Sequence, residues 1–168
     1  MTTLLNKTTQ SATPSKSNIQ SKSQDATTLL RADHKLVSGL FDDYEKASTK
    51  AMKKKLVSEI CMELSIHAQV EEEIFYPAVK HALKDHELVP EATVEHETLK
   101  SLIAQVDGVE PDGEMFDAKI KVLQEYVKHH VKEEQEEMFP KAKATKLDMM
   151  ELGDMIAARK RELMADRS

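Results

Sequence analysis

The stretch His67-Ala-Gln-Val-Glu71 returns later in the chain as His130-Val-Lys-Glu-Glu134, and in each copy a proline stands ten residues after the histidine. An acidic residue followed by a histidine precedes each copy, at Asp33-His34 and at Glu95-His96. The two lone histidines precede their copies by nearly equal intervals, 33 and 34 residues. A histidine and a glutamate four positions apart share one face of an α-helix. The chain therefore contains two copies of one helical unit that carries histidines and a carboxylate.

Apolar residues return every three or four positions from Asp25 onward, which is the pattern of amphipathic helices. The pattern predicts five helices, over about residues 25–47, 50–83, 90–107, 114–143 and 147–164. Four helices of similar length with short connections favour an all-α fold, an antiparallel up-down-up-down four-helix bundle, with the extra C-terminal helix on its outside. Pro77 and Pro140 lie inside the second and fourth helices and are expected to bend them.

The composition separates a tail from a domain. Residues 1–24 are rich in Ser, Thr, Gln and Lys and hold no acidic residue, which predicts a disordered tail followed by one domain over residues 25–168. The net charge of −6 argues against a nucleic-acid partner, and no apolar run is long enough to span a membrane. The single cysteine, Cys61, cannot form an internal disulfide, which favours a cytoplasmic location.

Six ligand-type side chains lie on the apolar stripes of the predicted helices and not on their solvated faces. They are His34, His67, Glu71, His96, His130 and Glu134. An ionised carboxylate in a bundle core is costly unless it is paired or bound to a metal. Six such residues in register across four helices therefore predict a metal centre inside the bundle.

The helix register leaves one alternative open. His129 and Glu133 have the same spacing as His130 and Glu134. The position of the following proline and the apolar stripe from Phe116 to Met138 favour His130 and Glu134. His129 and Glu133 are then expected to be flanking or surface residues.

Other acidic residues beside the predicted ligands are expected to stay outside the metal shell. Asp33 and Glu95 are interpreted as helix-face acids or as partners of the ligands, because neighbouring residues on a helix point about 100° apart. The remaining acids next to the two glutamates are assigned to the outer faces of the helices: Glu72, Glu73, Glu136 and Glu137.

Imidazole nitrogens and carboxylate oxygens without a thiolate suit iron, manganese or zinc. Two carboxylates placed between two histidine pairs suit two bridged ions, each with two terminal histidines. Zinc alone needs only one of these half-sites. Two iron ions are therefore the favoured cofactor, and manganese or mixed occupancy remains an alternative.

At these residues the chain resembles the hemerythrin-like HHE cation-binding family, over about residues 27–165. The motifs that carry the resemblance are Asp33-His34, His67 to Glu71 with Glu72, Tyr76 and Pro77, Glu95-His96, and His130 to Glu134 with Phe139-Pro140. The resemblance implies an antiparallel bundle that holds a non-haem di-iron centre, bridged by two carboxylates and an oxo or hydroxo group. It also implies a small diatomic or peroxide ligand, such as dioxygen, nitric oxide or peroxide.

Two departures separate the chain from the oxygen-carrying hemerythrins that it resembles. Those proteins have a second histidine four residues after the first on the third helix, where this chain has Lys100 after His96. Their last carboxylate stands five residues after the final histidine, where this chain has Gln135. The missing histidine predicts an open coordination position near Lys100, and oxidation by dioxygen in place of reversible carriage.

The same resemblance leaves other functions open: a sensing module whose metal occupancy is detected by a protein partner, and repair of iron–sulfur centres under nitrosative stress. Repair proteins of this family carry an additional N-terminal domain with a cysteine, and residues 1–24 offer nothing like it. A peroxidase- or oxidase-type activity is also left open. A ferritin-like oxidase is disfavoured, because it predicts Glu-x-x-His pairs where this chain has His-x-x-x-Glu.

Overall fold

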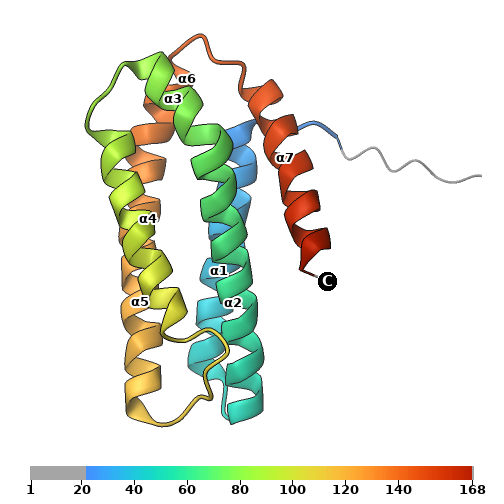
Figure 1. Ribbon diagram of the computed structural model, residues 1–168, viewed down its shortest axis with the longest axis vertical. Helices are drawn as coiled ribbons and strands as arrows, with labels where there is room; N and C mark the ends of the chain where they lie inside the picture. Colours follow the sequence, from blue (N-terminus) through green and yellow to red (C-terminus); the bar gives the residue numbers. More distant parts are fainter. Residues whose placement is uncertain (1–21, 168) are drawn as a thin grey trace, which may run out of the picture.

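The protein forms the predicted all-α bundle. The computed structural model describes residues 22–167, so most of the predicted tail over residues 1–24 lies outside the described residues. Four long helices, α1 (Ala26–Lys46), α2 (Lys50–Val70), α4 (Leu88–Ala104) and α5 (Glu114–Glu133), alternate in direction along the bundle (Figure 1). None of the helices formed by the described residues is long and apolar enough to cross a membrane.

Both prolines interrupt their helices through a π-helical turn. After α2 the chain forms η1 (Glu71–Phe75) and continues as α3 (Tyr76–Leu83); after α5 it forms η2 (Glu134–Met138) and continues as α6 (Phe139–Lys143). A proline lacks a backbone donor and its ring crowds the carbonyl four residues earlier. The wider turn accommodates both effects, and the backbone N–H of Tyr76 reaches back five residues to the carbonyl of Glu71. The expected interruption is therefore present, and each π-helix begins at a predicted metal ligand.

The apolar core is divided into two clusters along the bundle. One lies toward α3 and α6 and contains Phe75 and Phe139. The other lies toward the far end and contains Phe41 and Phe116. On α1, α4 and α5 the predicted ligands fall between the residues of the two clusters, and on α2 His67 lies at the edge of the first cluster, beside Ile66. The polar side chains are thus closed off by apolar packing at both ends.

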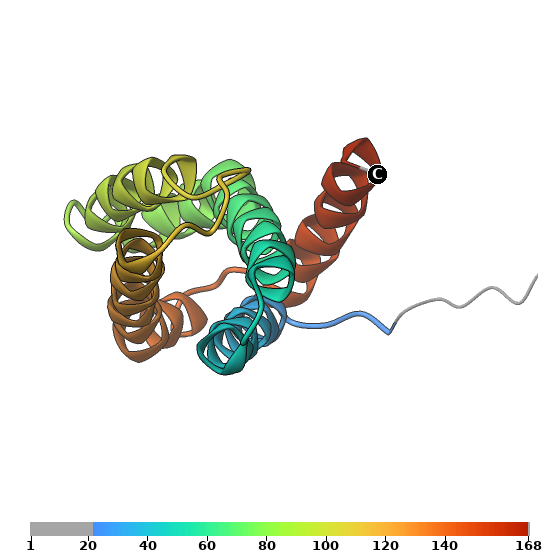
Figure 2. The same ribbon diagram turned by 90° about the horizontal axis from the view of Figure 1, so that it is seen from below.

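The last helix, α7 (Met149–Asp166), packs against α1 and α2 on the outside of the bundle (Figure 2). Its first turn is capped by Asp148, whose carboxylate accepts from the backbone N–H groups of Met150 and Glu151. Polar contacts reach from it toward the bundle interior: Arg159 binds Glu73, and Lys160 donates to Asp33. The helix is therefore attached to the segment that carries the predicted ligands.

Replacing Gly153 with alanine should destabilise this attachment. A Cβ atom at Gly153 would overlap the backbone carbonyl oxygen of Gln24, just before α1. Because backbone must shift to make room, Gly153→Ala is expected to cost about 1–3 kcal/mol of stability in urea unfolding. Gly39, whose added Cβ would meet nothing within 4 Å, is the matched control. Gly39→Ala should stabilise α1 by about 0.5–1 kcal/mol, and equal effects of the two substitutions would contradict this account.

Candidate metal centre

The six predicted ligand residues converge in the middle of the bundle. They come from all four long helices and both π-helices: His34, His67, Glu71, His96, His130 and Glu134. All six are buried, and the two glutamates are 0% and 2% exposed. The pseudo-twofold repeat of the sequence thus becomes a pseudo-twofold site.

The side chains form two groups of donor atoms. In the first group, the Nε2 atom of His34 lies 3.1 Å from Nε2 of His67 and 3.2 Å from Oε2 of Glu134. The Nε2 atom of His67 lies 3.0 Å from Oε1 of Glu71. The group therefore offers two nitrogen and two oxygen atoms, one from each residue, to a single point.

The second group shares Glu71 with the first. The Nε2 atom of His96 lies 3.2 Å from Nε2 of His130 and 3.2 Å from Oε2 of Glu71. The Nε2 atom of His130 lies 3.8 Å from Oε2 of Glu134. The two oxygens of Glu71 thus face different histidine pairs, as expected of a bridging carboxylate. Donor atoms about 2.1 Å from one ion stand roughly 3.0–3.4 Å apart, so these separations suit metal coordination.

Every imidazole in the centre has an oxygen partner on its outer nitrogen, Nδ1. Asp33 bonds His67 (3.1 Å) and Glu95 bonds His130. In the same way Glu72 bonds His96 (2.9 Å) and Gln135 bonds His34 (2.9 Å). These oxygens accept hydrogen bonds, so each Nδ1 carries a proton and each Nε2 faces inward, where it can bind a metal ion or a second proton. Four inward-facing nitrogens are an arrangement that a cation stabilises.

The charges of the metal-free centre support the same conclusion. Burial by itself lowers the pKa of His67, but the carboxylates of Glu71, Asp33 and Glu134 raise that pKa to about 10. Burial by itself raises the pKa of Glu71, but the neighbouring His67 and His96 hold that pKa well below its usual range. Without a metal, protonated histidine supplies the positive charge that the two carboxylates need. Oε1 of Glu71 then faces Nε2 of His67 at 3.0 Å, and Oε2 of Glu134 faces Nε2 of His34 at 3.2 Å.

Residues 25–142, most of the chain, match the hemerythrin HHE cation binding domain. The chain belongs to this family. The predicted family and its helical bundle are therefore confirmed, and the His and Glu clusters mark this HHE domain as a metal-binding domain.

A solved structure and a curated protein show related folds and sequences. The crystal structure of a hemerythrin HHE cation binding domain-containing protein from Mycobacterium kansasii has a TM-score of 0.74 and 23% identity, covering 85% of this chain and 89% of that one. A DNA nickase from Nostoc sp. (strain PCC 7120 / SAG 25.82 / UTEX 2576) is 26% identical over 111 residues, covering 66% of this chain. The chain spans only 31% of the length of that nickase.

Tyr76 is a member of the centre that the sequence reasoning did not select. Its hydroxyl lies 3.1 Å from Nε2 of His96 and 3.4 Å from Nε2 of His130. The same hydroxyl lies within hydrogen-bond distance of both carboxylates, 3.2 Å from Oε2 of Glu71 and 3.1 Å from Oε1 of Glu134. Burial and the two carboxylates raise the pKa of Tyr76 well above its usual value, so the metal-free HHE domain keeps the phenol protonated. A phenol oxygen therefore lies on the His96–His130 side of the centre.

Lys100 points to the edge of the bundle, and Glu72 is placed differently from the expectation. The Nζ atom of Lys100 lies 2.9 Å from Oε2 of Glu72 and 3.3 Å from Glu97, at the edge of the bundle. Glu72 was assigned to an outer helix face, but its other oxygen bonds His96. That assignment is wrong because Glu72 lies in the π-helix that begins at Glu71 and sits beside α4, close enough to reach the imidazole.

The register alternative is decided by burial. His130 is 3% exposed and faces the other inner histidines, whereas His129 is exposed. The predicted register of the fourth helix is therefore correct, and the contacts of Asp33 and Glu95 make them partners of ligand histidines. Cys61 is buried away from the centre, where burial and Asp107 raise the pKa of its thiol to about 12.

Replacing Tyr76 with phenylalanine should weaken the His96–His130 half of the centre. The substitution removes one oxygen and leaves the ring that fills the same space. We expect the affinity for one ion to fall about tenfold, as when the hydrogen-bonded surroundings of a metal are disturbed, with the thermal midpoint of the metal-free protein nearly unchanged. Metal titration of Tyr76→Phe measures this, and Tyr126→Phe, outside the centre, is the control. Identical titrations would exclude a role for the phenol oxygen.

Proposed function

We propose that this HHE domain holds two iron ions and that the pair binds or reacts with a small ligand such as dioxygen, nitric oxide or peroxide. The observation that carries the proposal is the sharing of Glu71 between two histidine pairs, with one oxygen toward each pair. In the proposed centre, His34 and His67 hold one ion, and His96 and His130 hold the other. Glu71 and Glu134 bridge the two.

The donor set fits this cofactor. Four neutral imidazoles and two bridging carboxylates suit iron, although manganese or zinc can bind the same atoms. Oε1 of Glu71 and Oε2 of Glu134 are buried and face histidine nitrogens, so they need a positive charge beside them, which a bound cation would supply in place of histidine protons. Tyr76 adds one oxygen on the His96–His130 side, so that half receives more protein donors than the other.

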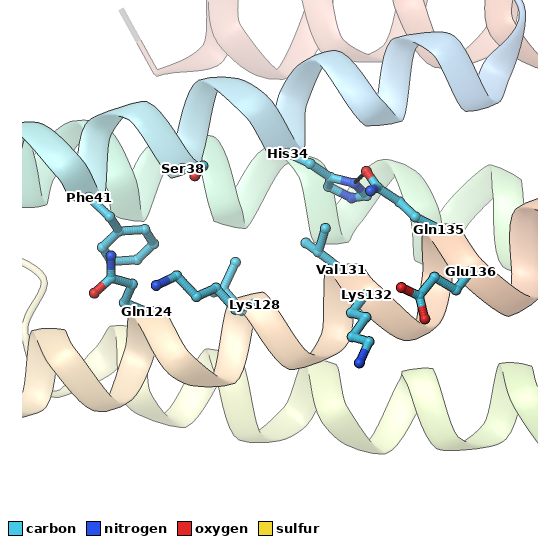
Figure 3. A pocket seen from close by; sticks show the side chains of 10 residues that line it. His34, Ser38, Phe41, Gln124, Lys128, Val131, Lys132, Gln135 and Glu136 are labelled. Carbon is cyan, nitrogen blue, oxygen red and sulfur yellow. Dashed lines mark hydrogen bonds between the residues drawn. The ribbon is translucent and has the colours of Figure 1, made fainter.

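The His34 side of the centre faces a cavity through which a small ligand can approach. A cavity of about 240 Å³ lies between α1 and α5. Figure 3 shows His34 and Gln135 at one end, with Phe41 and Gln124 at the other. Phe41 and Val131 give it apolar walls suited to diatomic molecules, and this half of the centre lacks the phenol oxygen. We therefore place the open coordination position beside His34, not beside Lys100.

The protein's own residues would control this chemistry. A bound iron pair supplies the electrons and the open coordination position. Asp33, Glu72 and Glu95 hold three of the imidazoles in the tautomer that binds metal, and Gln135 holds the fourth. The two apolar clusters keep bulk water from both ends of the site. Tyr76 keeps a proton close to both bridging carboxylates in the metal-free state.

Metal analysis with optical spectroscopy tests the proposal. The purified protein should contain two irons per chain. The reduced form should be oxidised by air without releasing dioxygen, and azide or nitric oxide should then change its spectrum. Repeated, fully reversible oxygenation would restore the carrier function, and a protein that takes up neither iron nor manganese would contradict the proposal as a whole.

A sensing role is the second candidate, favoured by the contacts of α7. Lys160 binds Asp33, which bonds the metal-facing His67, so the outer helix contacts the site through one intermediate residue. A partner could detect changes in α7. DNA cleavage, named for the Nostoc nickase, is not favoured by the net charge of −6. The cytoplasmic location stays a prediction.

A further inference from the structure

A second cluster of metal-ligating side chains lies at the surface beside the buried centre. His129 and Glu133 stand one turn apart on α5, and Glu95 reaches them from α4. The Nε2 atom of His129 lies 3.3 Å from Oε1 of Glu133 and 3.7 Å from Oε1 of Glu95. One donor atom from each residue lies within 4.8 Å of the others. The first separation is that of two ligands around one ion, which stand roughly 3.0–3.4 Å apart, and the others are somewhat wider, so small side-chain movements would close the set around an ion.

This outer cluster is connected to the buried centre through Glu95. One oxygen of Glu95 faces His129, while the other bonds Nδ1 of the inner residue His130. Glu95 is half-buried and His129 is exposed, so an ion bound here would keep contact with solvent. Only the carboxylate of Glu95 and the imidazole of His130 would then lie between an ion in the outer cluster and an ion in the buried centre.

A small cavity lies between the outer cluster and the buried centre. Its volume is about 10 Å³, roughly the room of one water molecule, and it is lined by outer residues Glu95 and Glu133 and by inner residues His130 and Glu134. Glu134 is 2% exposed, and its Oε2, which faces Nε2 of His34 at 3.2 Å, makes no hydrogen bond among the described residues. A buried carboxylate of the centre thus lines the same cavity as the outer carboxylates.

The charges on the two sides of α5 differ in the direction that cation entry requires. On the α4 side, Glu91 joins Glu95 and Glu133 around the small cavity. On the α1 side, the larger cavity carries Lys128 and Lys132 with Glu136 (Figure 3). A divalent cation is attracted to the first side and repelled by the two lysines on the second.

We propose that His129, Glu133 and Glu95 form an outer site for a divalent transition-metal cation, and that ions enter the buried centre through it. The nitrogen and oxygen donors suit Fe²⁺, Mn²⁺, Co²⁺ or Zn²⁺, with water completing the coordination. The outer site stands on its own geometry, whereas its loading role rests on the proposed function of the centre. Three ligands at an exposed site bind an ion more weakly than the buried ligands do. The outer ion would therefore exchange with ions in solution, while the inner ions would stay bound.

Co²⁺ titration of the metal-free protein tests the outer site, with Co²⁺ absorbance and metal analysis as readouts. The wild type should bind two ions tightly and a third more weakly. His129→Ala and Glu133→Gln should keep the two tight ions, weaken the third by about 10- to 100-fold, and slow the filling of the centre several-fold in stopped-flow mixing. His81→Ala and Glu137→Gln, at exposed positions outside the cluster, are the matched controls and should behave as the wild type.

The other possible outcomes test the outer site and its loading role separately. A wild type without a third ion, or a third ion that persists in His129→Ala, overturns the outer site. Loss of the third ion with unchanged filling rates overturns the loading role and leaves the site. A wild type that binds only one weak ion, sensitive to His129→Ala, supports the outer site while contradicting the proposed function of the buried centre.

Discussion

Removing the metal from this HHE domain should lower its thermal midpoint by roughly 10 °C or more near pH 9, and by clearly less near pH 6. The metal neutralises the buried carboxylates of Glu71 and Glu134, and without it only protonated histidine can do so. The pKa of His67 is raised to about 10 in the metal-free fold, against 6.5 as its ordinary value. A raised histidine pKa stabilises the fold below pH 6.5, and this stabilisation is lost as the pH rises toward 10.

Thermal unfolding of chelator-treated and metal-loaded protein at pH 6 and pH 9 measures the difference. In the loaded protein the inward nitrogens bind metal in place of protons, so its midpoint should change much less over this range. Restoring the metal at pH 9 is the control for damage during chelation. A metal-free protein that melts at the temperature of the loaded form at pH 9 would contradict the account of the buried charges.

Substituting His130 should remove one of the two ions proposed for the buried centre, whereas substituting His129 should remove neither. His130→Ala deletes a donor nitrogen and leaves His96 and the bridging carboxylates for one ion. His129→Ala removes an exposed side chain, so after desalting the metal content should stay at two per chain. The measurement is metal analysis of both variants, with unfolding midpoints to show that both fold. The reverse result would mean that the fourth helix is shifted by one residue.

The sequence predicted the helices and the inner donor atoms because both follow from periodicity. Spacing by four places His67 with Glu71 and His130 with Glu134 on one face each, and the repeat places the two halves in register. Membership of the family and the bundle are confirmed. The six residues lie together as expected, and metal binding by each of them stays a prediction that the substitutions above test.

Tyr76 and Glu72 were missed for a geometric reason. Five residues along an α-helix correspond to about 140° of rotation away from the starting face, so Tyr76 was not expected beside Glu71. The π-helical turn over Glu71–Phe75 changes that rotation and brings the phenol to the centre. The proline signalled an interruption but not its kind. Lys160 was missed because its contact with Asp33 depends on how α7 docks, which periodicity does not specify.

Gln135 makes the two halves of the centre unequal. It is the only one of the four partners on Nδ1 that is a neutral amide; Glu72, its counterpart in the other half, is a carboxylate. An anionic partner makes an imidazole a stronger electron donor and favours the higher oxidation state of the metal it binds. With Tyr76 also on their side, His96 and His130 would form the more electron-rich half of the centre. A metal held beside His34, next to the cavity, would then be the one for which the lower oxidation state is favoured.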